Sequence, residues 1–351
     1  MRTLRWSLLA LAAIASVGYG QGKVAAGAPF TLRWSEGKCV DCKTAAQLGR
    51  IQFVSRSEAW AIGYNFGPPG PQGSGDFVVV HTKDAGHSWT EVPQTRQHAG
   101  DADGPPAFSF LDAGRGWIAW WNPAEEPKMI RTRDGGQHWQ DVSQEFLQKV
   151  SFFDDSRGNG AEVTRFLRTN DGGRTWTETQ IPHLRFIDRM VFLTPERGWI
   201  AGTDGKDVFV FRTTNGGSDW EESRTTALNE LDYVRDLFFL DQNRGWLITW
   251  HLNDSGTYLF STADGGKTWA PEPDPSFQGK GKWAGVVRFV SGQRGFVFAA
   301  EAKQHSLMYT TDGGAHWSKQ ALPRSVYDCQ VFEGDLLCSS PGFALVTLHP
   351  K

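Results

Sequence analysis

The chain has 351 residues, with 36 basic and 39 acidic side chains and a formal net charge of −3 at pH 7. A mildly acidic chain lacks the basic surface that general nucleic-acid binding requires, so this class of function is excluded. The length would allow two domains of ordinary size, but closed β-rich folds also reach it as one domain.

The first 20 residues have the pattern of a secretory signal. Arg2 and Arg5 precede the apolar run WSLLALAAIASV, and small residues follow up to Gly20. We expect cleavage after Gly20, because the run is too short to span a bilayer comfortably; an uncleaved membrane anchor is the alternative. Cleavage removes two positive charges and leaves residues 21–351 with a net charge of −5. We therefore expect an exported protein, periplasmic or extracellular, that is not itself transmembrane.

Six similar nonapeptides recur along the chain, at spacings of 37 to 50 residues. They read HTKDAGHSW, RTRDGGQHW, RTNDGGRTW, RTTNGGSDW, STADGGKTW and YTTDGGAHW, and they end at Trp89, Trp139, Trp176, Trp220, Trp269 and Trp317. A second pattern, which we call the RGW turn, runs in phase with the first as SEAWAIG, GRGWIAW, ERGWIAG, NRGWLIT and QRGFVFA. A short apolar run precedes each, and the third unit keeps only a degenerate SRGNGAEV. Each unit predicts four short strands, which is typical of a β-propeller blade.

The nonapeptide resembles the Asp-box, the S/T-x-D-x-G-x-x-W turn of sialidase-type propellers. In such a turn the acidic side chain accepts hydrogen bonds from backbone N–H groups, a glycine such as Gly173 takes a positive φ, and the tryptophan is buried between sheets. Six turns on separate blades cannot converge on one substrate, and their spacing is not that of a calcium loop. We therefore predict a structural role for all six. The turn residues are Asp84, Asp134, Asp171, Asn215, Asp264 and Asp312.

The last blade is split between the two ends of the chain. After Trp317 three further strands are predicted without a box, whereas FTLRWSE near the N-terminus carries Trp34 in the position of a box tryptophan. Pairing of FTLRWSE with FALVTL would complete the blade and remove open sheet edges. We predict an all-β fold, in which residues 21–351 form one seven-bladed β-propeller of four-stranded antiparallel blades, closed by the N-terminal strand.

The four cysteines form two pairs. A two-residue hairpin turn at Glu333 and Gly334 would place Cys329 opposite Cys338, and we expect this pair to be oxidised in an exported chain. Cys39 and Cys42 form a C-x-x-C motif, which is either redox-active, half of a metal site or a local disulfide. No second C-x-x-C accompanies it, so we favour the local disulfide. We expect no metal and no cofactor.

The boxes, the in-phase RGW turns, the signal and the sevenfold count together resemble the photosystem II stability/assembly factor family, over the whole mature chain. The resemblance implies an exported, non-enzymatic propeller that binds a protein partner, namely a membrane-protein intermediate during its assembly. The fold alone does not fix the pathway. We expect a monomer without enzymatic activity.

A glycan-binding or glycoside-hydrolysing, sialidase-like propeller is the alternative. The N-terminal Arg-Ile-Pro segment that sialidases pair with their boxes is not found. Hydrolysis would need two carboxylates roughly 5–10 Å apart. Loop residues that would have to supply them are Asp101, Asp103, Glu125, Glu126 and Asp204.

We expect the partner to bind on the face opposite the boxes, where the loops vary in length. Three basic residues each open an innermost strand ten positions before the RGW tryptophan or its equivalent, and a fourth lies one position further away. They would form a basic ring at the mouth of a central channel; ordinary strand-end charge, paired locally with Asp188 and Asp236, is the alternative. The four residues are Arg50, Lys149, Arg189 and Arg235.

Overall fold

The computed structural model describes residues 28–40, 42–43, 47–66, 75–98, 106–120, 128–223, 228, 230–231, 233–273, 278–301 and 304–351. Within these ranges the regular structure consists of β-strands alone. No helix with the length and apolarity of a membrane span occurs in the described part of the chain. The expected signal, residues 1–20, lies outside the described residues.

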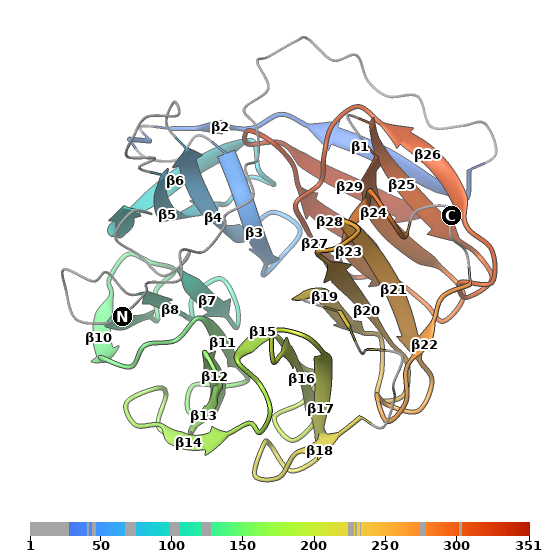
Figure 1. Ribbon diagram of the computed structural model, residues 1–351. Helices are drawn as coiled ribbons and strands as arrows, with labels where there is room; N and C mark the ends of the chain where they lie inside the picture. The colour runs from blue at the N-terminus through green and yellow to red at the C-terminus, as the bar shows by residue number, and fades with distance from the viewer. Residues whose placement is uncertain are drawn as a thin grey trace.

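The strands form seven antiparallel sheets arranged around a common centre, as in a seven-bladed propeller (Figure 1). The first sheet contains β3 (Gln47–Phe53), β4 (Ala59–Phe66), β5 (Gly75–Thr82) and β6 (Ser88–His98), with the short β2 (Lys38–Cys39) parallel to β6. The second contains β7 (Ala107–Phe110), β8 (Gly116–Trp120), β9 (Lys128–Thr132) and β10 (Gln140–Ser143), and the third β11 (Lys149–Phe152), β12 (Gly158–Glu162), β13 (Arg165–Thr169) and β14 (Thr177–Gln180).

The next three sheets follow the same order along the chain. The fourth contains β15 (Phe186–Phe192), β16 (Gly198–Thr203), β17 (Val208–Thr213) and β18 (Glu221–Glu222). The fifth contains β19 (Tyr233–Phe239), β20 (Gly245–His251), β21 (Gly256–Thr262) and β22 (Ala270–Pro271), and the sixth β23 (Lys282–Phe289), β24 (Gly295–Glu301), β25 (Gln304–Thr310) and β26 (Ser318–Leu322).

The seventh sheet joins the two ends of the described chain. It contains β27 (Asp328–Phe332), β28 (Asp335–Ser339) and β29 (Leu345–Pro350), and β1 (Phe30–Ser35) pairs with β29 as its outermost strand. Phe30 lies opposite Pro350 and Ser35 opposite Leu345, which confirms the predicted pairing of FTLRWSE with FALVTL. Phe30 is fully buried and its ring meets Phe296 of the sixth sheet edge-on, so β1 contributes to the core as well as to the sheet.

The innermost strands, β3, β7, β11, β15, β19, β23 and β27, lie nearest the common centre (Figure 1), and side chains bond most of them to the innermost strand of the next sheet. Gln52 on β3 accepts the backbone N–H of Phe110 on β7 at 3.0 Å and donates to its carbonyl at 2.8 Å. Asp328 on β27 accepts the backbone N–H of Ile51 on β3 at 3.0 Å. Equivalent side-chain acceptors join Ser109 to Phe152, Asp188 to Val234 and Asp236 to Val287. These bonds satisfy backbone donors that no ladder partner reaches.

Aromatic stacking joins several neighbouring sheets. The RGW tryptophan Trp199 on β16 stacks on Phe239 of β19, with ring centroids 3.6 Å apart, and its indole N–H donates to the Gly265 carbonyl at 2.8 Å. Phe239 in turn meets Trp269 edge-on. The same stack is formed by Trp60 on Phe110, Trp117 on Phe152 and Trp246 on Phe289. The RGW pattern and the apolar run of the following unit are therefore two halves of one interface.

The third unit departs from this pattern because Asn159 stands where the five other units with a repeated turn carry an aromatic residue. Asn159 is buried, and its amide nitrogen has no hydrogen-bond partner. Phe192 of the next sheet instead stacks on Phe166 of β13, at a centroid distance of 5.8 Å. The degenerate SRGNGAEV thus marks a different interface at the same place in the fold.

Candidate functional site

The six repeated turns share one hydrogen-bond pattern. In the third, one carboxylate oxygen of Asp171 accepts the hydroxyl of Thr169 at 2.8 Å and the backbone N–H of Thr175 at 2.9 Å. The N–H of Gly173, whose φ is +91°, donates to the Thr169 hydroxyl oxygen at 2.9 Å. The side chains of Asp84, Asp134, Asp264 and Asp312 accept the equivalent bonds. Each acidic side chain is therefore used to close its own turn.

The fourth turn shows that a negative charge is not required. The amide oxygen of Asn215 accepts the Thr213 hydroxyl and the Asp219 N–H, both at 3.0 Å. A neutral acceptor of the same shape thus closes the turn. Of the turn tryptophans, Trp89, Trp269 and Trp317 are buried, and Trp139, Trp176 and Trp220 are half-buried.

The turn carboxylates are held ionised. A hydrogen bond from the backbone N–H of His138 is the largest cause that lowers the pKa of Asp134 to about 2, and His316 acts in the same way on Asp312. The imidazoles of these two histidines bond to the same carboxylates at 2.6 and 2.7 Å. The histidines therefore belong to the turns, and no group of three or more potential metal ligands occurs among the described residues.

The repeated turns and the RGW turns lie on one face of the molecule, which we call the turn face. The Gly172 N–H of the third repeated turn donates to the Ser156 carbonyl of the RGW turn in the same sheet, at 2.8 Å. The RGW arginine reaches the neighbouring sheet: Arg115 bonds to Asp112 in its own turn at 2.8 Å and to Asp155 in the next at 3.2 Å. Further bonds between sheets join Arg157 to Glu196, Arg197 to Gln242 and Arg56 to Glu333. Several charges on this face are thus paired with one another, between as well as within sheets.

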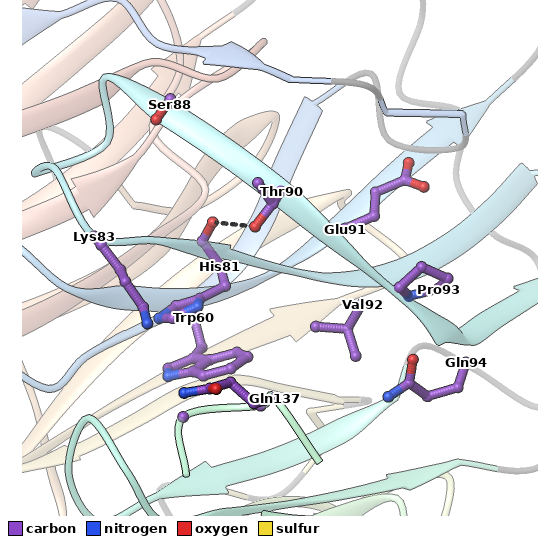
Figure 2. A pocket seen from close by; sticks show the side chains of 12 residues that line it. Trp60, His81, Lys83, Ser88, Thr90, Glu91, Val92, Pro93, Gln94 and Gln137 are labelled. Carbon is purple, nitrogen blue, oxygen red and sulfur yellow. Dashed lines mark hydrogen bonds between the residues drawn. The ribbon is translucent and has the colours of Figure 1, made fainter. Parts of the chain in front are cut away.

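Figure 2 shows a pocket of about 340 Å³ between the first and second sheets, lined among others by Trp60, His81 and Glu91. His81 stacks on one face of Trp60, with ring centroids 3.7 Å apart, and Phe110 stacks on the other face at 4.0 Å. Both faces of Trp60 are therefore covered and cannot stack on a ligand. Burial lowers the pKa of His81, although a 2.8 Å hydrogen bond to Glu58 opposes this effect.

Among the residues that the structure describes, the pocket lining does not present the two free carboxylates that glycoside hydrolysis uses. Glu91 is the acid among its lining residues, and it is paired with Arg96 at 2.6 Å. Asp204 accepts the backbone N–H groups of Lys206 and Asp207 in its own turn. Asp101, Asp103, Glu125 and Glu126 lie outside the described residues.

The four basic residues that open inner strands lie close enough to influence one another, and we call them the axial basic cluster: Arg50, Lys149, Arg189 and Arg235. Burial lowers the pKa of Lys149 to about 8, and the positive charges of Arg189 and Arg50 contribute to this shift. Burial likewise lowers the pKa of Arg235 to about 10, again with a contribution from Arg189. Arg50 keeps a solvent-accessible surface, but the surrounding strands displace water from its guanidinium and lower its pKa.

None of the four cations forms an ion pair with an acidic residue in the described part of the chain. Arg189 donates to the carbonyls of Asp188 and Arg235. The guanidinium of Arg235 lies 4.6 Å from the ring centre of Trp250 and 5.8 Å from that of Trp283, and that of Arg50 lies 5.2 Å from the ring of Phe108. The cations are therefore contacted by carbonyls and aromatic rings. Asp328 attracts Arg50 and Asp188 attracts Lys149 from beyond ion-pair distance, so the positive charge of the cluster is compensated only in part.

The two acids considered for local pairing have closer partners elsewhere, although Asp188 still interacts electrostatically with Arg189 and Lys149. Asp236 pairs with Arg288, a residue of β23 that the sequence pattern did not select because it lies eight positions before Phe296 rather than ten. Asp188 accepts the Val234 N–H at 3.0 Å, and burial raises its pKa. The sequence patterns do not mark Trp250 or Trp283 either, although Trp250 directly follows the RGW pattern NRGWLIT.

Both cysteine pairs form disulfides in the structure. Cys329 lies opposite Cys338 in the β27–β28 pair, with Cα atoms 4.1 Å apart. Cys39 and Cys42 have Cα atoms 5.5 Å apart, and Cys39 pairs with Trp89 at the edge of the first sheet.

Comparison with known proteins gives the fold. No family model and no curated protein matches the chain. Among solved structures, it is similar to YCF48 bound to a D1 peptide (TM-score 0.65, 16% identity, covering 95% of this chain and 98% of that one) and to YCF48 from Cyanidioschyzon merolae (0.62, 15%, 90% and 98%). It is also similar to the GH74 xyloglucanase from Xanthomonas campestris (0.61, 14%), where the match covers 90% of this chain and 53% of the other. At these identities the likeness establishes a β-propeller and leaves binding and hydrolysis as competing functions.

Proposed function

We propose that this chain is an exported, non-enzymatic propeller of the Asp-box type that binds an anionic segment of a protein partner at the axial basic cluster, as a scaffold in membrane-complex assembly. We base the site on one observation: Arg50, Lys149, Arg189 and Arg235 converge, and none of them is in ion-pair contact with an acid among the described residues. Cations that are partly desolvated and unpaired are costly to a fold. A bound carboxylate would remove this cost, which makes the cluster a site for anions.

Two further observations support a peptide as the ligand. The cations lie on the inner strands of a rigid ring of sheets, so a ligand would meet a preformed site. One of the similar solved structures is YCF48 with a bound D1 peptide, which shows that a propeller of this shape holds a peptide. On the turn face, by contrast, the RGW arginines Arg115 and Arg157 are paired with acids of the protein.

A glycoside hydrolase is the second candidate, because GH74 propellers are among the similar structures. The match covers about half the length of those enzymes. In this chain, the pocket between the first and second sheets offers one acid, Glu91, that is already paired with Arg96. We therefore rank hydrolysis below peptide binding.

The test is charge reversal of the whole cluster, with the mature chain and a labelled tetraglutamate peptide as the probe. The Arg50→Glu, Lys149→Glu, Arg189→Glu, Arg235→Glu variant should lose at least about 100-fold in affinity, measured by fluorescence anisotropy. Binding to the parent should weaken with added salt, since exposed charges are screened beyond about 8–10 Å at ordinary ionic strength. A pull-down from native envelopes with parent and variant then identifies the natural partner by its loss from the variant.

A matched control reverses the same number of charges elsewhere. Lys83, Arg133, Lys267 and Arg294 are exposed on the turn face, and their replacement by Glu should leave peptide affinity within about twofold of the parent. Equal affinity of the parent and the cluster variant would refute the site. Turnover of xyloglucan oligosaccharides that is abolished by one carboxylate substitution would refute the scaffold.

A further inference from the structure

Large apolar side chains are exposed beside the axial basic cluster. Among the described residues, Tyr233 and Leu252 are 42% and 48% exposed, which makes them two of four large hydrophobic residues so exposed. Tyr233 lies opposite Trp250 in the β19–β20 pair, and Leu252 follows Trp250 by two positions. Trp250 and Trp283 lie around the same guanidinium, that of Arg235, and we group Tyr233, Trp250, Leu252 and Trp283 under the name aromatic rim.

The rim surrounds one cation of the cluster. Arg235 lies between the rings of Trp250 and Trp283, at 4.6 and 5.8 Å from their centres. Trp283 lies across the backbone of Gly285, where an added Cβ would come within 2.4 Å of the indole ring. Glycine at this position therefore lets Trp283 lie flat on β23 beside the guanidinium. The rim and the cluster are thus continuous.

The backbone that carries the rim is fixed by hydrogen bonds. Leu252 accepts the N–H of Ser255 at 3.2 Å in the turn between β20 and β21. The Gly281 N–H donates to the Asp254 carbonyl at 3.1 Å, and the Ala284 N–H donates to the Thr257 hydroxyl at 2.8 Å. The turn of the fifth sheet and the start of the sixth are therefore joined, and the exposed side chains stand on a fixed support.

The acids near the rim are occupied. The Asp254 carboxylate bonds to the Tyr258 hydroxyl and lies 3.3 Å from the His251 imidazole. Asp236 forms an ion pair with Arg288. Arg235 is left with two aromatic faces and no carboxylate from the described residues. A surface that combines exposed apolar area with incompletely compensated positive charge suits a ligand that carries both an apolar group and a negative charge.

We propose that the aromatic rim and the axial basic cluster form one binding site for an extended acidic peptide with a large apolar side chain next to its carboxylates. This inference rests on the proposed function. The carboxylates bind Arg189 and its neighbouring cations, while the apolar side chain packs on Tyr233 and Leu252 and excludes water from Trp250. Tryptophan, tyrosine and arginine are the residues that most often dominate binding energy, and here they lie together.

The experiment compares two hexapeptides of equal charge, EEELEE and EEESEE, binding to the mature chain. The leucine peptide should bind about tenfold more tightly, as expected when one apolar side chain is buried. In the Tyr233→Ser, Leu252→Ser variant the preference should fall to within about twofold, while the affinity for EEESEE is retained. Both substitutions are at exposed positions, so the fold should be preserved.

Leu193 supplies the control, because it is 40% exposed and lies in the RGW turn between β15 and β16, on the turn face. Leu193→Ser should leave the leucine preference unchanged. If both peptides bind the parent equally and still depend on the cluster, the rim inference is wrong and the proposed function survives. If neither peptide depends on the cluster, the proposed function itself is wrong. A parent that sediments as a dimer, and a double variant that sediments as a monomer, would show that the rim binds a second copy instead.

Discussion

On the turn face, Arg115 bonds to Asp112 and Asp155, and the repeated turns enclose their carboxylates in hydrogen bonds from the turn itself. In the axial basic cluster, Lys149 and Arg235 have pKa values lowered by burial and by a neighbouring positive charge, and no described acid pairs with them. The two regions belong to the same sheets and carry many of the same residue types. They differ in that ion pairs are common on the turn face, whereas none is found among the described residues for the four cations of the cluster.

This difference separates what stabilises the fold from what is available for binding. The repeat places an acceptor opposite each donor on the turn face, so the turns need no ligand. The repeat determines where the cations of the cluster stand in the sequence, but it does not supply acids to pair with them. Asp188 accepts a backbone N–H, and Asp236 pairs with Arg288. Groups that destabilise the free protein are the ones a ligand can stabilise.

The largest expected effect is at the contact between sheets beneath the turn face. Trp199→Ala removes a buried indole that stacks on Phe239 and should lower the free energy of unfolding by about 3–5 kcal/mol. Trp199→Phe keeps the stack but loses the hydrogen bond to Gly265, and should cost about 1 kcal/mol. Guanidinium unfolding monitored by circular dichroism measures both. Equal losses would mean that the hydrogen bond, rather than the stack, joins the sheets.

A smaller loss is expected within one repeated turn. Asp171→Ala leaves the Thr169 hydroxyl and the Thr175 N–H without their acceptor, which should cost about 1–2 kcal/mol. Asp171→Asn should cost less, because Asn215 already closes the fourth turn. Peptide affinity should be unchanged in both variants. Normal thermal unfolding combined with lost binding would assign a ligand to the turn face and remove the contrast between the two regions.

In the axial basic cluster, a substitution is expected to raise the free energy of unfolding rather than lower it. Replacing Lys149 by Met removes a partly buried positive charge beside Arg189 and should raise the free energy of unfolding at pH 7 by about 1–2 kcal/mol. The folded pKa of about 8 lies below the unfolded value of 10.5, so the unfolded state binds more protons between these values. Parent stability should therefore gain a contribution as pH rises from 8 to 10.5, and the Met variant should lack it. A destabilised Met variant would show that the charge is matched after all.

The smallest effect concerns the one repeated turn whose first glycine position is occupied by another residue. Ala85 has a φ of +58°, whereas its counterpart Gly172 in the third turn has +76°. A residue with a side chain in the left-handed region costs the folded state about 1–2 kcal/mol, and glycine avoids this cost. Glycine also loses more conformational freedom on folding, which cancels about half of the gain. Ala85→Gly should raise the free energy of unfolding by about 0.5–1 kcal/mol in thermal unfolding. A loss would indicate that the Ala85 methyl group packs favourably.

Sequence periodicity predicted the strand units and the split last sheet because the signals are local or recur in phase. The six nonapeptides marked turns that close within five residues, as the bonds from Thr175 to Asp171 show. The hairpin at Glu333 and Gly334 fixed the register of Cys329 with Cys338, since pairing follows directly from turn length. Candidate residues of the cluster could be named for the same reason: Arg50, Lys149 and Arg189 occupy one repeat position.

What these cations contact was decided only by the tertiary structure. Asp236 is adjacent to Arg235 in sequence but pairs with Arg288, 52 residues away on the next sheet. Trp199 contacts Phe239, and Arg235 contacts Trp283, because neighbouring sheets pack against each other. A repeat specifies each sheet through short-range hydrogen bonds. Which side chains meet between sheets depends on how all the sheets pack around a common centre, and that follows from the whole chain rather than from any one unit.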